Sequence, residues 1–109
     1  MTTLKVKDYT EFPGPRFREI GPYSGQDFLE TYLLPLAKEH GASLIVDLDD
    51  TAGYGSSFLE EAFGGLVRKG IPKDVAIAIG ENLISEEDPT LLGEIRAYIE
   101  DSINELSSK

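Results

Sequence analysis

The chain has 109 residues and a mass of 12.0 kDa, and 40% of its residues are apolar, which suits one modest hydrophobic core. No apolar run approaches the ~18 residues of a membrane helix, and no apolar stretch follows the first charges, so neither a spanning segment nor a signal peptide is expected. The chain has no cysteine, which excludes disulfides, thiolate metal sites and cysteine nucleophiles. Its single histidine excludes a histidine-rich metal cluster. These features favour a single cytoplasmic domain over residues 1–109.

Charge is the strongest signal in the composition. Twenty Asp and Glu against ten Lys and Arg give a formal net charge of −10, and the basic residues are scattered. Nucleic acid and anionic membranes bind proteins through clustered Lys and Arg, so neither is an expected partner. Arg16 and Arg18 are expected to pair with carboxylates on this acidic surface. The same surface suits docking on a basic protein partner.

The first part of the chain predicts strands, a turn region and a helix. Residues 4–9 alternate apolar and polar side chains, which favours an edge strand. The Pro- and Gly-rich stretch after them predicts a turn, with a short second strand at residues 17–20. Ser24 is the expected N-cap of an amphipathic helix that Pro35 kinks and Gly41 ends.

The middle of the chain predicts a strand that runs into a helix. Residues 43–50 are apolar first and acidic last, which is typical of a buried central strand, and we expect Asp47 to end that strand. A glycine-containing turn then leads into a second amphipathic helix that starts at Ser56 or Ser57. Gly64 and Gly65 lie inside this helix, where each costs ~1 kcal/mol relative to Ala, so they predict a close approach of another backbone.

The last part predicts a further strand and a last helix. Residues 74–79 are nearly all apolar, which favours a strand, and residues 83–84 extend the pattern. Asp88 is the expected N-cap of the last helix, with Pro89 as its first residue. Because strands alternate with helices, we expect an α/β fold: a mixed sheet of about four strands with three helices packed on it.

The chemistry-bearing residues lie between the central strand and the second helix, the usual ligand position in open α/β sheets. Asp47-Leu48-Asp49-Asp50-Thr51 resembles the Asp-x-Asp-Gly-Thr motif of haloacid-dehalogenase-like phosphatases. That resemblance implies Asp47 as nucleophile, Asp49 as general acid and Mg²⁺ between them. However, Asp50 stands at the motif's glycine, and no downstream Gly-Asp-x-x-x-Asp segment completes the metal site.

A purely structural interpretation of the same segment stays open. Ser56 or Ser57 would cap the helix, which is worth ~1 kcal/mol. Gly53 and Gly55 would form the turn, and the Asp49 carboxylate would cap the end of the strand or keep it hydrated. Capping and function are compatible, because a serine at a helix amino terminus lies where a phosphoryl group is best stabilised.

The segment also resembles the STAS domain, the fold of anti-sigma-factor antagonists. Asp47-Leu48 matches the family's strand pair, and Ser56-Ser57 with Leu59 matches the Asp-Ser-Ser/Thr-Gly-Leu start of a helix. Gly55 replaces the Asp of that pattern and Phe58 replaces the Gly. Since the family is phosphorylated at this serine pair, the resemblance implies Ser56 as the best match for the phosphoacceptor.

The chain more closely resembles a family of small STAS-like domains of unassigned function. Three stretches carry this resemblance: residues 16–28, residues 46–49 with 53–66, and residues 88–89 with 98–99. What it implies is a STAS-like fold and a regulatory or binding role, without an assigned activity.

We therefore predict a non-catalytic regulatory protein–protein interaction module that needs no cofactor and is switched by phosphorylation at the start of the second helix. By family analogy, its partner is an ATPase or kinase of the histidine-kinase-like fold. The alternatives left open are a small metal-dependent phosphohydrolase that uses Asp47 and Asp49, and a homodimer formed through an exposed sheet edge. The predicted phosphoacceptor or binding residues are Ser56, Ser57, Gly53, Gly55, Asp49 and Tyr54.

Overall fold

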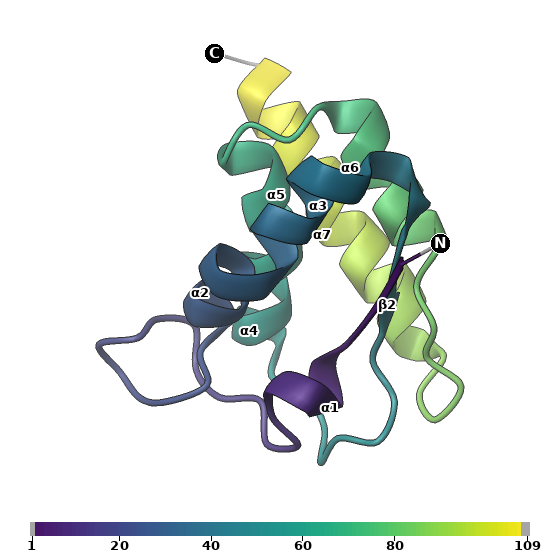
Figure 1. Ribbon diagram of the computed structural model, residues 1–109. Coiled ribbons are helices and arrows are strands. Elements are labelled where there is room, and N and C mark those ends of the chain that lie inside the picture. The colour runs from purple at the N-terminus through teal and green to yellow at the C-terminus, as the bar shows by residue number, and fades with distance from the viewer. Residues whose placement is uncertain (1, 108–109) are drawn as a thin grey trace.

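The computed structural model describes residues 2–107 as a mixed α/β fold that is mostly helical (Figure 1). Within these residues the sheet has two parallel strands, β1 (Thr2–Lys5) and β2 (Leu44–Asp47). On the other side of β2, Ile84 adds a single parallel bridge opposite Asp47. Parallel pairing of two strands far apart in the chain requires a crossover, which the first long helix provides.

That first long helix covers residues 25–40 without a break, and it follows the short α1 (Val6–Tyr9) and an irregular loop. Ser24 caps it as predicted, since the Asp27 N–H donates to Ser24 Oγ over 3.0 Å. Pro35 has no N–H to donate to the turn before it, and the helix there widens into a π-helical segment. Its segments are α2 (Gly25–Phe28), η1 (Leu29–Leu33) and α3 (Leu34–His40), followed by the short 3₁₀ segment η2 (Gly41–Ser43).

The second long helix, residues 56–68, lies at the centre of the molecule. Its segments are α4 (Ser56–Leu59), the π-helical η3 (Glu60–Gly64) and α5 (Gly65–Arg68). The close backbone approach predicted at Gly64 and Gly65 is not found: an added Cβ at Gly65 would collide with Leu29 Cδ2, a side-chain atom of the first long helix. Two further helices follow, α6 (Lys73–Glu81) and α7 (Thr90–Ser107), and Asp88 caps α7 by accepting from the Thr90 N–H.

Three predicted elements are wrong, so the expected four strands and three helices are not confirmed. Residues 74–79 belong to α6 and not to a strand, because an unbroken apolar run suits a buried helix as well as a strand. Residues 17–20 form turns, since neighbouring prolines and glycines leave the chain irregular. The strand predicted at residues 4–9 ends at Lys5, and α1 begins at once.

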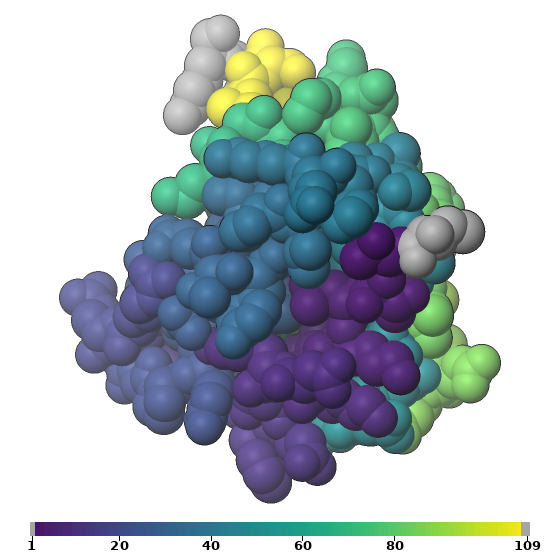
Figure 2. Space-filling view, viewed as in Figure 1, coloured from purple at the N-terminus to yellow at the C-terminus, as the bar shows by residue number. Residues whose placement is uncertain are grey.

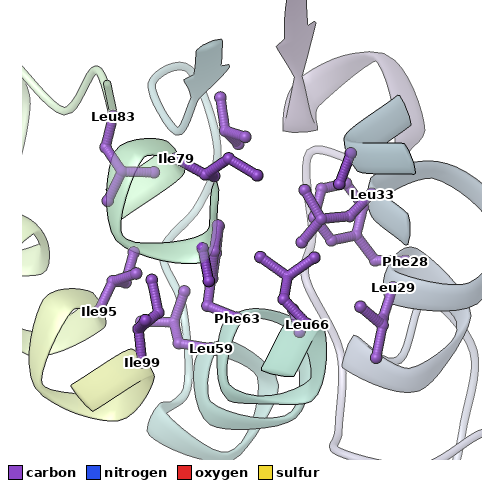
Figure 3. Close-up of a cluster of buried hydrophobic side chains, with 14 of the residues drawn as sticks. Phe28, Leu29, Leu33, Leu59, Phe63, Leu66, Ile79, Leu83, Ile95 and Ile99 are labelled. Atoms are coloured by element: carbon purple, nitrogen blue, oxygen red, sulfur yellow. The ribbon is translucent and has the colours of Figure 1, made fainter. Parts of the chain in front are cut away.

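A single hydrophobic core joins both long helices, α6 and α7 (Figure 3). The second long helix lies in its middle, and every residue from Ala62 to Val67 is buried. This placement fixes the direction of α4, so the turn that precedes Ser56 is held at the rim of the core. The side chains labelled in Figure 3 are Phe28, Leu29, Leu33, Leu59, Phe63, Leu66, Ile79, Leu83, Ile95 and Ile99.

Candidate functional site

The segment between β2 and α4 lies where the sequence predicts it: Asp47 ends the strand and Ser56 is the first residue of the helix. Ser56 and Ser57 are both exposed. Gly55 occupies the N-cap position and no side chain caps the helix, so the interpretation of Ser56 or Ser57 as a cap is wrong. The first amides of α4 are therefore left without a side-chain acceptor.

The turn itself is open around its glycines and closed around its tyrosine. A Cβ at Gly53 or Gly55 would meet nothing within 4 Å, although Gly53 needs to be glycine because its φ is 125°. Tyr54 packs inward against Phe58, with ring centroids 5.8 Å apart, and its hydroxyl donates to the Leu48 carbonyl over 2.8 Å. Burial raises the pKa of Tyr54 well above its ordinary value. Tyr54 thus supports the turn from below, while the glycines face solvent.

The two aspartates of the phosphatase-like motif bond to backbone amides. Asp47 Oδ1 accepts from the Asp49 N–H over 3.0 Å. Asp49 accepts from the N–H groups of Glu86 and Glu87, over 3.1 and 3.0 Å, and so ties the turn to the segment before α7. Carboxylates held this way have part of their metal-binding capacity already used. Across residues 2–107, no group of three or more His, Cys, Asp or Glu side chains is arranged to hold a metal ion.

A charged cluster lies one turn along the helix from Ser56, on the same face. Glu60 accepts from Arg16 Nη1 over 2.5 Å and from Arg68 Nη1 over 2.7 Å, and Arg16 also lies 3.4 Å from Glu61 Oε1. Burial of Glu60 opposes its ionisation, but the hydrogen bonds from Arg68 and Arg16 outweigh burial and lower its pKa. The prediction that Arg16 pairs with surface carboxylates is confirmed, although the sequence did not identify its partners.

Residues 10–24, which we call the 10–24 loop, border the same turn and carry exposed apolar side chains, two of which, Phe12 and Ile20, the sequence did not single out. Phe12 is 71% exposed, Ile20 68% and Tyr23 49%. The loop is pinned at its base, since the Gly14 N–H donates to the Tyr23 carbonyl over 2.8 Å. Figure 2 shows it along the lower left of the molecule. It joins the turn through the Ala52 N–H, which donates to the Glu11 carbonyl over 2.8 Å.

A family model for the STAS-like domain of unknown function (DUF4325) matches residues 24–80. The chain belongs to this family. The match begins at the cap of α2 and includes β2, the turn, the second long helix and most of α6. No curated protein and no solved structure matches the chain.

The arginines of the STAS-like domain are held by its own carboxylates at this site. Arg18 donates to Asp27 over 3.0 Å and to Glu30 over 2.5 Å, as expected for an acidic surface. Asp27 also accepts from the Tyr9 hydroxyl over 2.7 Å; this hydrogen bond lowers the pKa of Asp27, and burial raises that of Tyr9. With Arg16 and Arg18 neutralised, the surface around the 10–24 loop stays acidic. No helix in the described part of the chain combines the length and apolarity needed to cross a bilayer.

Proposed function

We propose that this STAS-like domain is a non-catalytic regulatory protein–protein interaction module that is switched by phosphorylation of Ser56. The observation that carries the proposal is the position of Ser56: an exposed first residue of a helix, after a turn whose glycines Gly53 and Gly55 are themselves exposed. A kinase must draw its target serine into a cleft, and an open turn permits that approach. Ser57 is the neighbouring second choice, also exposed.

The local charges favour a phosphate that the folded domain tolerates. A phosphoserine carries about −1.5 to −2 charges at neutral pH, and the unpaired amides at the start of α4 stabilise it. Glu60, one turn away, opposes the added charge. However, Glu60 is already balanced by Arg16 and Arg68, so the repulsion is partly offset. The main consequence of phosphorylation is therefore a change of the surface rather than of the fold.

Arg16 provides a way for that change to reach the docking surface. It belongs to the 10–24 loop, and its guanidinium is shared between Glu60 and Glu61. A phosphate on Ser56 competes with these carboxylates for Arg16, since phosphate accepts stronger bonds from a guanidinium than a single carboxylate does. The 10–24 loop, which displays Phe12 and Ile20, would then have different contacts in the phosphorylated and the unphosphorylated protein.

The partner that fits is a protein with a basic surface around an apolar recess, because the loop offers apolar side chains within an acidic surrounding. The family resemblance points to an ATPase or kinase of the histidine-kinase-like fold. Catalysis is not part of the proposal, because Asp47 and Asp49 are engaged with backbone amides.

The test begins with the tagged protein purified from its native host, with its phosphorylation sites mapped by mass spectrometry. The protein that co-purifies is then produced separately and titrated against wild type, Ser56→Ala and Ser56→Asp, with Ser57→Asp as the matched control. We expect phosphate on Ser56 and an affinity that Ser56→Asp changes at least about tenfold while Ser57→Asp does not. Equal affinities for all four forms would remove the switch from the proposal.

A further inference from the structure

One face of the molecule carries balanced charges although the chain as a whole is acidic. It lies between α6 and α7 on the side away from the core, and a groove of about 410 Å³ runs along it. We call it the α6–α7 face. The residues of the groove on which the argument rests are Lys73, Ile77, Glu81, Arg96, Glu100 and Ile103.

This face combines exposed apolar side chains with a firm base. Ile77 lines the groove and is 48% exposed, and Leu106, also 48% exposed, extends the apolar strip into a neighbouring hollow that it shares with Ile103. Beneath them, Ile99 is buried in the core (Figure 3). Arg96 donates to the Gly80 carbonyl over 2.9 Å, which holds α6 against α7. The face is thus built rigidly, with apolar groups left in water.

The charges of the groove cancel. The positive charges of Lys73 and Arg96 balance the negative charges of Glu81 and Glu100, whereas the whole chain has a formal net charge of −10. Arg96 lies 3.8 Å from Glu81, but within residues 2–107 neither Lys73 nor Glu100 has a salt bridge. Two unpaired charges of opposite sign therefore border an apolar strip.

We propose that the α6–α7 face binds a second copy of this chain in a two-fold symmetric dimer. Two copies that each carry −10 repel one another, so they meet with least cost where the surface is neutral. In a two-fold interface each contact occurs twice, with the roles exchanged. Lys73 of one copy then pairs with Glu100 of the other, and Glu100 pairs with Lys73. A uniformly acidic partner would repel Glu100, and a uniformly basic partner would repel Lys73.

The size of the face sets the expected strength. The 18 residues of α7 span roughly 27 Å and the nine residues of α6 roughly 13 Å, so with a width of about 10 Å for each helix the face offers about 400 Å² for each copy. A specific interface of standard size buries about 800 Å² per partner. The dimer is therefore expected to be weak, with a dissociation constant in the micromolar range and a fast exchange between monomer and dimer.

Sedimentation equilibrium of the full chain, from about 1 μM to about 1 mM, tests this directly. We expect the average mass to rise from 12.0 kDa toward twice that value as the concentration increases. Ile77→Asp and Leu106→Asp should each raise the dissociation constant at least about tenfold. Ile20→Asp is the matched control, because it makes the same change at an exposed isoleucine of the 10–24 loop and should have no effect.

A charge exchange isolates the proposed pair and relies only on exposed side chains, so folding is preserved. Lys73→Glu and Glu100→Lys should each weaken self-association, and an equimolar mixture of the two variants should recover it as a heterodimer. A chain that stays at 12.0 kDa through the whole concentration range would overturn the proposal. So would a dimer that Ile77→Asp leaves intact and Ile20→Asp dissociates, or two charge variants whose mixture does not associate.

Discussion

The contact between the two long helices depends on Gly25, and replacing it with alanine is the sharpest test of the fold. Gly25 opens α2 where that helix crosses α4. An added Cβ would lie 2.5 Å from the Phe58 carbonyl oxygen, 3.0 Å from its Cα and 3.1 Å from its carbonyl carbon. All three atoms belong to the backbone of a buried helix, so no rotamer change relieves the overlap, and α2 must move away from α4.

The expected loss of stability follows from that geometry. Overpacking of a core costs about 1–3 kcal/mol, and a clash with backbone alone belongs at the upper end, about 3 kcal/mol. In a domain of this size each kcal/mol lowers the melting temperature by about 4–8 °C, so Gly25→Ala should melt roughly 12–24 °C below wild type. Thermal unfolding followed by far-ultraviolet circular dichroism measures the difference.

Gly93 supplies the matched control for this substitution. It lies exposed within α7, and a Cβ there would meet nothing within 4 Å. Gly93→Ala should therefore gain helix propensity, about 0.5–1 kcal/mol, and melt a few degrees above wild type. The reasoning is refuted if Gly25→Ala melts within about 4 °C of wild type, or if both substitutions shift the melting temperature in the same direction.

The remaining predictions concern charge and metal. Ser56→Asp should change the free energy of unfolding by less than about 1 kcal/mol in urea titration, and a larger loss would mean that the turn does not tolerate a phosphate. Because the pKa of Tyr9 is raised in the fold, the stability that its neutral hydroxyl contributes is fully present below about pH 10 and is lost as the pH rises further. The difference in free energy of unfolding between wild type and Tyr9→Phe should therefore shrink above about pH 10. Because the pKa of Asp27 is lowered, the difference between wild type and Asp27→Asn should hold above about pH 4 and fall below it, and a flat profile would contradict the Tyr9–Asp27 hydrogen bond. Calorimetry with Mg²⁺ and a general phosphatase assay should both be blank, whereas saturable Mg²⁺ binding that Asp49→Asn removes would establish the metal-dependent alternative.

The sequence alone determined the features that depend on neighbouring residues. The cap at Ser24, the end of the central strand at Asp47 and the start of the second long helix at Ser56 each follow from short-range hydrogen bonding and apolar periodicity. The family was also recognisable from the sequence, since its matching stretches lie in continuous blocks. The acidic surface and the internal pairing of the arginines followed from composition.

Only the tertiary structure decided the secondary structure of segments with an ambiguous pattern and the contacts between positions far apart in the chain. Residues 74–79 form a helix because α7 and the second long helix offer a surface that buries one side of the run and leaves Ile77 in water. A continuous apolar run carries no periodicity from which this is readable. The pairing of Arg16 with Glu60 joins positions 44 residues apart, and Asp49 accepts amides 37 and 38 residues away. Local propensity does not encode such contacts; they exist because the packed core brings those positions together.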